Sequence, residues 1–430
     1  MRILLAHNSL YFPSFGGGDK SNRLLMESLA AHGHKVRVAA RVEKFGFEAH
    51  DALLRQLAAR SCPADATRAS HIEFLLNGVE VRVLTRDPFL RAFFEQQAQE
   101  FDPDVILTST DDPGQLLLHT ALHAPHARVV YLVRAIIALP FGPDSPFPNA
   151  AKTAAIRRAD GVVAVSENVA EYARKWGHLD AVHVPISLLD PGTPESVGRF
   201  DNRFVTLVNP CAVKGISIFL GLARRFPEAE FAAVPTWGTT PEDLAALESQ
   251  PNVTILPPVD DIHEVLKQTR IALVPSLWAE ARSRVILEAM VRGIPVLASD
   301  VGGLAEAKLG VPYLLPVRPV TEYHSRVDDL MVPVAEIPEQ DLGPWAAALD
   351  RLLTDRAHYH ELSAHSRAAA MAYAANLNAG PFAAYLERIL ASPRRRHGAA
   401  ANRPLSEERK KLLALRLKHL QVKEEPGDTQ

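Results

Sequence analysis

The sequence predicts an α/β protein built from two doubly wound domains in series. Short apolar runs alternate with segments of helical spacing, which is the pattern of buried parallel strands joined by helices. The alternation stops at 190–194, where two prolines and a glycine occur together, and then resumes. The chain has 430 residues, enough for two domains that each bury a core of their own.

The first series of alternating elements runs from residue 3 to residue 184. Residues 3–6 form a short apolar run that predicts a buried strand, and 21–32 has helical spacing. Gly33 predicts the end of that helix, because glycine readily adopts the left-handed conformation found there. Further strands are expected over 36–40, 78–84, 105–108, 129–133, 161–165 and 181–184, and helices over 150–159 and 166–176.

The second series has the same character. Strands are expected over 204–208, 230–234, 253–256, 271–274 and 296–298, and helices over 216–225, 241–248, 262–268, 284–291 and most of 359–390. Two Rossmann-like halves in series predict a ligand in the cleft between them, at the carboxyl ends of the strands. We therefore expect one domain over 1–190 and another over 200–374, with helices over 375–392 that pack back on the first domain.

The end of the chain, 393–430, differs from both halves. Three arginines at 394–396 and a Gly/Ala stretch predict a basic, flexible linker, and Ser406 can cap a short amphipathic helix that ends near Leu420. This stretch resembles the linker helices of modular polyketide and nonribosomal peptide synthases, which implies docking to such an assembly line or a remnant of a fusion to one. A tail that packs on its own domain or touches acidic lipid is the alternative.

The composition is that of a globular protein with balanced charge. Apolar residues make up 47%, and 47 Lys and Arg stand against 50 Asp and Glu, so no nucleic-acid partner is indicated. Cys62 and Cys211 lie far apart without metal-ligand or redox spacing, which suits a reducing compartment. Because no apolar run reaches the roughly 18 residues of a membrane span, we expect a cytoplasmic protein, with peripheral contact at the inner membrane face left open.

Two glutamates, Glu280 and Glu288, flank a predicted helix start in the second half. Ser283 is a candidate N-cap for this helix, and Gly293 ends it. A helix N-terminus favours a diphosphate, and a carboxylate can accept hydrogen bonds from two adjacent sugar hydroxyls. The spacing therefore suits a nucleotide sugar, although two acids without a shared role would give the same pattern.

This segment resembles the E-x7-E signature of retaining glycosyltransferases of family 4, which have the GT-B fold. The matching residues are Pro275, Ser276, Glu280, Arg284, Val285, Glu288, Ala289, Met290, Gly293, Pro295 and Val296. The resemblance implies that Glu280 holds hydroxyls of the donor sugar, that Glu288 holds the ribose, and that transfer proceeds with retention and without an obligatory metal or other cofactor. The chain departs from the family at Arg282 and Ser283, where Phe and Gly are common; Ser283 can still present its backbone N–H to phosphate, beside Val285.

Two glycine-rich segments add to the resemblance. Gly302 and Gly303 resemble the family's S-x-x-G-G-x-x-E segment and predict close backbone approach to the donor, with a structural turn as the alternative. Three more glycines follow the first strand: Gly16, Gly17 and Gly18. In related enzymes this loop lies beside the donor phosphates and the acceptor, and a plain flexible turn is again the alternative. Its spacing is not G-x-G-x-x-G, which argues against a dinucleotide oxidoreductase.

The cationic residues match the family only in part. Lys214 resembles the lysine that neutralises the diphosphate leaving group. The family usually has an arginine five residues earlier, where this chain has Asn209; Arg284 or Arg282 can supply the missing charge, or the donor is held more loosely. Many relatives carry a histidine after the fourth strand of the first domain, where this chain has Arg134. An arginine cannot act as a general base, but it can bind a phosphate or an acidic acceptor.

Other titratable residues show weaker patterns. His7 and His119 can supply an imidazole, although a lone histidine is more often structural. The D-x-D pattern at 102–104 resembles a metal motif of another glycosyltransferase fold, but its place in a turn before a strand favours a structural role. Asp111 and Asp112 follow the next strand and are candidates to face the acceptor.

The sequence as a whole therefore predicts a glycosyltransferase that moves a sugar from a nucleotide-diphosphate donor to a glycan, a lipid or a natural product. Glu280, Lys214 and Arg284 are its expected catalytic residues. A nucleotide-sugar epimerase or hydrolase on the same fold is one alternative. A non-catalytic GT-B module that scaffolds a partner is another, favoured by Asn209 and Arg134.

Overall fold

The structure is a computed structural model that describes residues 1–42, 49–66, 70–85 and 89–394. Within these ranges, none of the helices is long and apolar enough to cross a bilayer. The predicted linker and amphipathic helix beyond Arg394 lie outside the described residues. Met1–Arg394 forms one compact unit that contains two parallel sheets.

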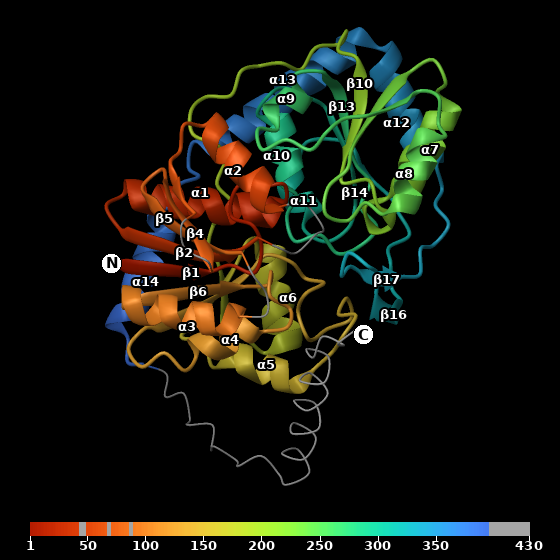
Figure 1. Cartoon of the computed structure of the whole chain (residues 1–430). Coiled ribbons are helices and arrows are strands. Elements are labelled where there is room, and N and C mark those ends of the chain that lie inside the picture. Colours follow the sequence, from red (N-terminus) through yellow and green to blue (C-terminus); the bar gives the residue numbers. More distant parts are fainter. Residues whose placement is uncertain (43–48, 67–69, 86–88, 395–430) are drawn as a thin grey trace, which may run out of the picture. The chain divides into compact units, whose positions relative to one another are not determined.

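The first domain is built on a nine-stranded sheet in the order β3-β4-β5-β2-β1-β6-β7-β8-β9 (Figure 1). Its strands are β1 (Arg2–Ala6), β2 (Lys35–Arg41), β3 (Ala64–Asp65), β4 (His71–Leu76), β5 (Val79–Leu84), β6 (Val105–Ser109), β7 (Arg128–Val133), β8 (Gly161–Ala164) and β9 (Ala181–His183). Its helices are α1 (Gly17–Ala31), α2 (Ala49–Ala59), α3 (Leu90–Phe101), α4 (Leu116–Ala121), α5 (Ala150–Arg157) and α6 (Glu167–Gly177). Neighbouring strands pair in parallel from β5 through β2, β1 and β6 to β9, and crossover connections join them. At the edge of the sheet, β4 pairs antiparallel with β5, and β3 pairs antiparallel with β4.

The second domain has a six-stranded parallel sheet in the order β12-β11-β10-β13-β14-β15. Its strands are β10 (Phe204–Val208), β11 (Glu230–Val234), β12 (Val253–Ile255), β13 (Thr269–Val274), β14 (Val296–Ser299) and β15 (Leu314–Leu315), with a separate antiparallel pair of β16 (Tyr323–Val327) and β17 (Pro333–Ala335). Its helices are η1 (Ala212–Lys214), α7 (Ile216–Arg225), α8 (Pro241–Glu248), α9 (His263–Leu266), α10 (Arg284–Met290), α11 (Leu304–Lys308), α12 (Gly343–Thr354) and α13 (Arg356–Ala374). The predicted α/β architecture of two doubly wound domains is confirmed.

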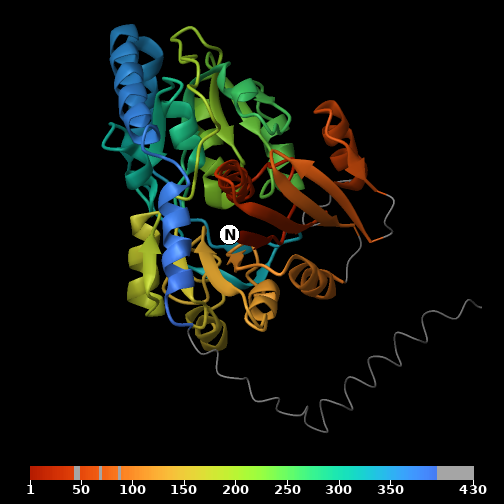
Figure 2. The same ribbon diagram turned by 90° about the vertical axis from the view of Figure 1, so that its left-hand side faces the viewer.

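The last described helix, α14 (Gly380–Ala391), returns to the first domain (Figure 2). The helical stretch expected over 359–390 is therefore two helices, because Pro381 cannot sit in a helix interior and starts α14 instead. Phe382 and Leu386 are fully buried in the core of the first domain. At Gly161 of β8, a Cβ would lie 2.3 Å from the Tyr385 hydroxyl, so the strand and α14 approach closely.

We expect Phe382→Ala to lower the free energy of unfolding by about 3–5 kcal/mol, since it leaves a cavity where α14 meets the first domain. Leu75→Ala is the matched control: Leu75 is 62% exposed, and its truncation should change stability by less than about 0.5 kcal/mol. Urea unfolding followed by circular dichroism measures both. Equal stabilities for the two variants would show that α14 does not contribute to this core.

Candidate functional site

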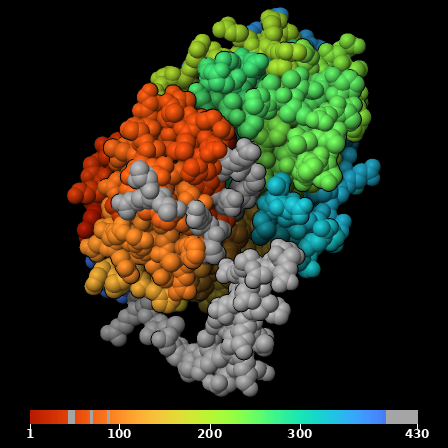
Figure 3. All heavy atoms as spheres, viewed as in Figure 1, coloured from red at the N-terminus to blue at the C-terminus, as the bar shows by residue number. Residues whose placement is uncertain are grey.

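Both sheets contribute to one cavity of about 790 Å³. Segments after β1, β6 and β7 line it from the first domain, and segments after β10, β11 and β13 line it from the second. In the space-filling view, the surfaces of the two domains, red to orange and green to cyan, adjoin (Figure 3). The cavity therefore lies at the carboxyl ends of both sheets, where doubly wound domains bind ligands.

Lys214 and Glu280 form an ion pair on the second-domain side of this cavity. Lys214 ends η1 directly after β10, and Glu280 lies in the loop between β13 and α10. The two segments cross closely at Gly215, whose φ is +80° and where a Cβ would lie 2.0 Å from the Pro275 carbonyl oxygen. Only glycine fits this crossing, and the crossing brings the ammonium group to the carboxylate.

The environment of Glu280 keeps it ionised. Its Oε1 accepts hydrogen bonds from Lys214 and, at 2.6 Å, from the Ser276 hydroxyl. Burial would raise the pKa of Glu280, but the charge of Lys214 and these hydrogen bonds outweigh burial and hold the pKa below its usual range. Glu280 is thus a buried carboxylate whose charge is balanced by a neighbouring cation.

Glu288 and Arg284 form a second acid–cation pair, one turn apart on α10. Nη2 and Nε of Arg284 donate to Glu288 Oε1 at 2.7 and 3.1 Å. Nη1 donates to the backbone carbonyl of Leu188, in the segment that joins the two domains. The structure therefore brings Glu280, Lys214, Glu288 and Arg284 to one cavity, with each acid already paired.

Two tryptophans that were not predicted as site residues from the sequence form an aromatic wall beside these pairs. The rings of Trp237 and Trp278 are stacked with centroids 6.1 Å apart and an interplanar angle of 28°. The Lys214 ammonium lies 5.0 Å from the Trp278 ring centroid, within the range of a cation–π interaction. Each tryptophan follows a strand end, after β11 and β13, and that position is the sequence signal that could have revealed them.

Ser283 and Val285 line the cavity at the start of α10. Ser283 occupies the predicted N-cap position, but its side chain makes no capping hydrogen bond. Gly302 and Gly303 are not among the cavity-lining residues. A Cβ at Gly302 would lie 2.5 Å from the Glu280 carbonyl oxygen, and Gly303 donates to that oxygen at 2.7 Å. These glycines support the Glu280 loop, and their expected contact with the donor stays a prediction.

Asn209 and Arg282 both line the cavity. The side chain of Asn209 is uncharged, and that of Arg282 is paired with an acid. Asn209 Oδ1 accepts the Gly238 backbone N–H at 3.0 Å and thereby positions the loop that carries Trp237. Arg282 donates to Glu306 at 3.0 Å, and its guanidinium lies 4.5 Å from the Tyr373 ring centroid. Arg282 is therefore tied to α11 and α13.

The glycine loop begins α1 in the cavity wall. Gly16 is the N-cap residue of α1 and has no side chain to satisfy the free N–H groups. A Cβ at Gly16 would lie 3.7 Å from Trp237, and one at Gly17 would lie 3.7 Å from Arg284, so the loop approaches the second domain. Gly18 has open space around it.

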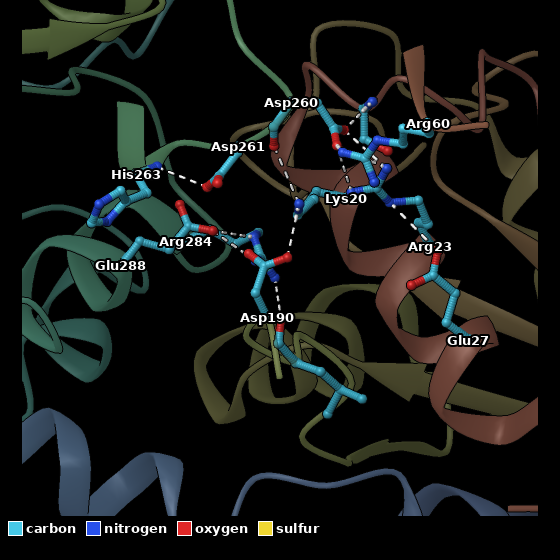
Figure 4. A network of polar contacts seen from close by, with 12 residues as sticks. Lys20, Arg23, Glu27, Arg60, Asp190, Asp260, Asp261, His263, Arg284 and Glu288 are labelled. Carbon is cyan, nitrogen blue, oxygen red and sulfur yellow. Dashed lines mark hydrogen bonds and ion pairs between the residues drawn. The ribbon is translucent and has the colours of Figure 1, made fainter. Parts of the chain in front are cut away.

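Asp260, in the segment after β12, fastens α1 to the second domain (Figure 4). Its carboxylate accepts from the Ser14 backbone N–H at 2.9 Å, from Arg23 at 3.1 Å and from Arg60 at 2.6 Å. Lys20 adds a bond to the Asp260 carbonyl at 3.2 Å and an ion pair with Asp190 at 2.9 Å. Burial would raise the pKa of Asp260, but Arg23, Ser14 and Lys20 hold it below its usual range, so the carboxylate stays charged.

Neither candidate histidine can act as a free base in the cavity. His7 is fully buried behind the lining, with Nδ1 2.8 Å from Asp111 and Nε2 3.3 Å from Asp19. Burial opposes its charge, but the two aspartates outweigh burial and raise the pKa of His7 to about 9. His119 is exposed on α4 and does not line the cavity. Asp111 and Asp112 do line it, and within the described residues no group of three or more acids, histidines or cysteines is placed to hold a metal.

The charge of His7 predicts a pH-dependent stability. The charged form of His7 contributes its full stabilisation at pH values below the unfolded-state pKa of about 6.5. This contribution to the free energy of unfolding is lost as the pH rises through the folded-state pKa of about 9. Between pH 6.5 and 9.5, the wild type should lose on the order of 3 kcal/mol more unfolding free energy than His7→Asn, since one pKa unit corresponds to about 1.4 kcal/mol. Urea titrations across pH measure this difference; parallel curves would show that His7 is neutral in the folded state. Lys308, whose pKa burial lowers to about 7, titrates in both proteins and cancels.

Comparison with known proteins gives two family matches. Residues 15–186 match the domain described as Glycosyltransferase Family 4, and residues 204–332 match the one described as Glycosyl transferases group 1. No curated protein sequence matches the chain.

Solved structures share the fold over nearly the whole chain. Sucrose-phosphate synthase from Thermosynechococcus elongatus is 16% identical, with a TM-score of 0.61 over 98% of this chain and 100% of that one. HepE from Anabaena in complex with UDP and glucose is 17% identical, with a TM-score of 0.62 over 91% and 100%. TarM from S. aureus, in complex with UDP, alpha-GlcNAc-glycerol and Fondaparinux, is 9% identical, with a TM-score of 0.63 over 91% and 100%. With glycosyltransferase domains in both halves and this fold, the chain is a glycosyltransferase of the GT-B type.

Proposed function

We propose that the protein transfers a sugar from a nucleoside-diphosphate sugar to an acceptor hydroxyl with retention of the anomeric configuration. The observation that carries this proposal is the placement of two acid–cation pairs, Lys214–Glu280 and Arg284–Glu288, in the wall of one cavity between two doubly wound domains. A nucleotide sugar offers a partner to each of the four groups, since its diphosphate is anionic and its two sugar rings carry hydroxyls.

Donor binding exchanges these pairs for ligand contacts. The Lys214 ammonium moves from Glu280 to the diphosphate, and the released carboxylate accepts hydrogen bonds from hydroxyls of the donor sugar. Arg284 and Glu288 divide in the same way between phosphate and ribose. The bound donor thus satisfies every charge that the empty site satisfies internally, and no buried charge is left without a partner.

The reaction breaks the bond between the anomeric carbon and the phosphate oxygen. The electron pair leaves with the nucleoside diphosphate, and the cations stabilise the charge that develops there. The acceptor oxygen forms the new bond on the same face of the sugar, and its proton passes to the departing phosphate oxygen. Trp278, beside Lys214, helps to exclude water from the departing phosphate.

The ligands of the structural relatives suggest which donors to test first. HepE and TarM were solved with UDP, and the pneumococcal O-GlcNAc transferase GtfA with UDP and GlcNAc. UDP-sugars are therefore the first donors to test, with glycans, lipids and natural products as acceptors. The expected docking of the tail to a synthase or an acidic membrane falls on residues outside those described and stays a prediction.

We expect Glu280→Ala to lower transfer at least about a hundredfold while the protein stays folded, because the donor sugar loses the carboxylate that orients it. Glu264→Ala is the control, since this acid is 55% exposed on α9 and lies outside the cavity lining. Product formation is measured by mass spectrometry after incubation of UDP-sugars with an acceptor panel. Wild-type turnover in Glu280→Ala would refute the assignment, and sugar released or epimerised without acceptor would favour the hydrolase or epimerase.

A further inference from the structure

Arg134 occupies a special place in the cavity wall. It is the first residue after β7, at the carboxyl edge of the first-domain sheet, and it lines the cavity. Its backbone N–H donates to the Thr110 hydroxyl at 3.0 Å, which fixes the point where its side chain leaves the sheet. Arg134 therefore faces the ligand space from the domain opposite Lys214 and Arg284.

The guanidinium of Arg134 has no protein partner. Nε, Nη1 and Nη2 are all shielded from solvent, and none makes a hydrogen bond within the described part of the chain. A cation that has lost its hydration without gaining an acceptor is costly. Burial accordingly lowers the pKa of Arg134 to about 9, although nearby Asp111 favours the charge. Such a donor set fits an anionic group supplied by a ligand.

Five other cations that line the cavity donate to protein acceptors, and a sixth, Arg41, also has an interaction partner. Lys214 donates to Glu280, Arg284 to Glu288 and Leu188, Arg282 to Glu306, Lys20 to Asp260, and Lys152 to Pro113. The acids near Arg134 are also in use, since Asp111 and Asp19 both hold charged His7. Arg134 is therefore the described lining cation whose nitrogens are all available to a ligand.

The second domain places another positive charge, that of Arg284, near the guanidinium of Arg134. Arg284 disfavours the charged form of Arg134, so the two guanidinium groups lie within electrostatic range of each other across the domain boundary. An anion between the two guanidinium groups would relieve this repulsion and would also accept hydrogen bonds from Arg134. Asn209, which lines the same cavity, contributes no charge to such an anion.

We propose that Arg134 binds the donor diphosphate from the first domain and forms a cationic clamp with Lys214 and Arg284 of the second. This inference rests on the proposed function and adds to it a residue that positions the leaving group. A guanidinium suits the task because its planar fork can give two parallel hydrogen bonds to one phosphate. The diphosphate would then contact both domains at once.

The test compares wild type, Arg134→Gln and Arg134→Lys as full chains by isothermal titration calorimetry with UDP, GDP and ADP and with the matching nucleosides. We expect Arg134→Gln to bind its diphosphate at least tenfold more weakly, with nucleoside binding unchanged, and Arg134→Lys to recover part of the loss. Arg91→Gln is the control, since Arg91 is 63% exposed on α3 and should bind as the wild type does.

Stability without ligand gives a second readout. Because the guanidinium of Arg134 is unpaired and shielded from solvent, the ligand-free Arg134→Gln variant should melt no lower than the wild type. Inorganic pyrophosphate should stabilise this variant less than it stabilises the wild type. If Arg134→Gln binds UDP as tightly as the wild type does, the inference about Arg134 is overturned, while the proposed function still stands. If turnover nevertheless fell, the oxyanion would belong to the acceptor, and the diphosphate assignment would be wrong. A wild-type chain that binds no nucleoside diphosphate would overturn both the inference and the proposed function.

Discussion

The ion pair between Lys214 and Glu280 is the interaction on which the site depends. It exists because the segment after β10 crosses the end of β13 at Gly215, where only a glycine fits. Gly302 and Gly303 pack against the backbone of the Glu280 loop. Ser276 donates a hydrogen bond to the Glu280 oxygen that Lys214 also contacts. The empty site therefore balances the charges of Lys214 and Glu280 against each other.

The cavity is a property of the pair of domains. Asp260 ties the second domain to α1, and Arg284 reaches the Leu188 carbonyl at the domain junction. Ser166, at the start of α6, donates to the Ala281 carbonyl at 2.7 Å, beside Glu280. These contacts bring groups of the first domain to the cavity wall formed by the second. They make the geometry of the cavity dependent on the domain arrangement, because groups from both domains line it.

The features predictable from sequence are those encoded by neighbouring residues. Buried parallel strands are recognisable in the sequence as short apolar runs. Glu280 and Glu288 are predictable together because only one loop and one helical turn separate them. Contacts between distant segments could not be predicted: Trp237 stacks on Trp278, and Asp260 meets Arg23 of α1, only because strand order brings them together. The charge on buried His7 likewise depends on Asp111, more than a hundred residues away.

We propose that donor binding divides the Lys214–Glu280 pair between the phosphate and the sugar. A crystal structure of the full chain with a bound UDP-sugar tests this most directly. We expect the Lys214 ammonium to contact a phosphate oxygen and the Glu280 carboxylate to contact hydroxyls of the donor sugar. A bound nucleotide sugar that leaves the pair intact, or that lies outside this cavity, would contradict it.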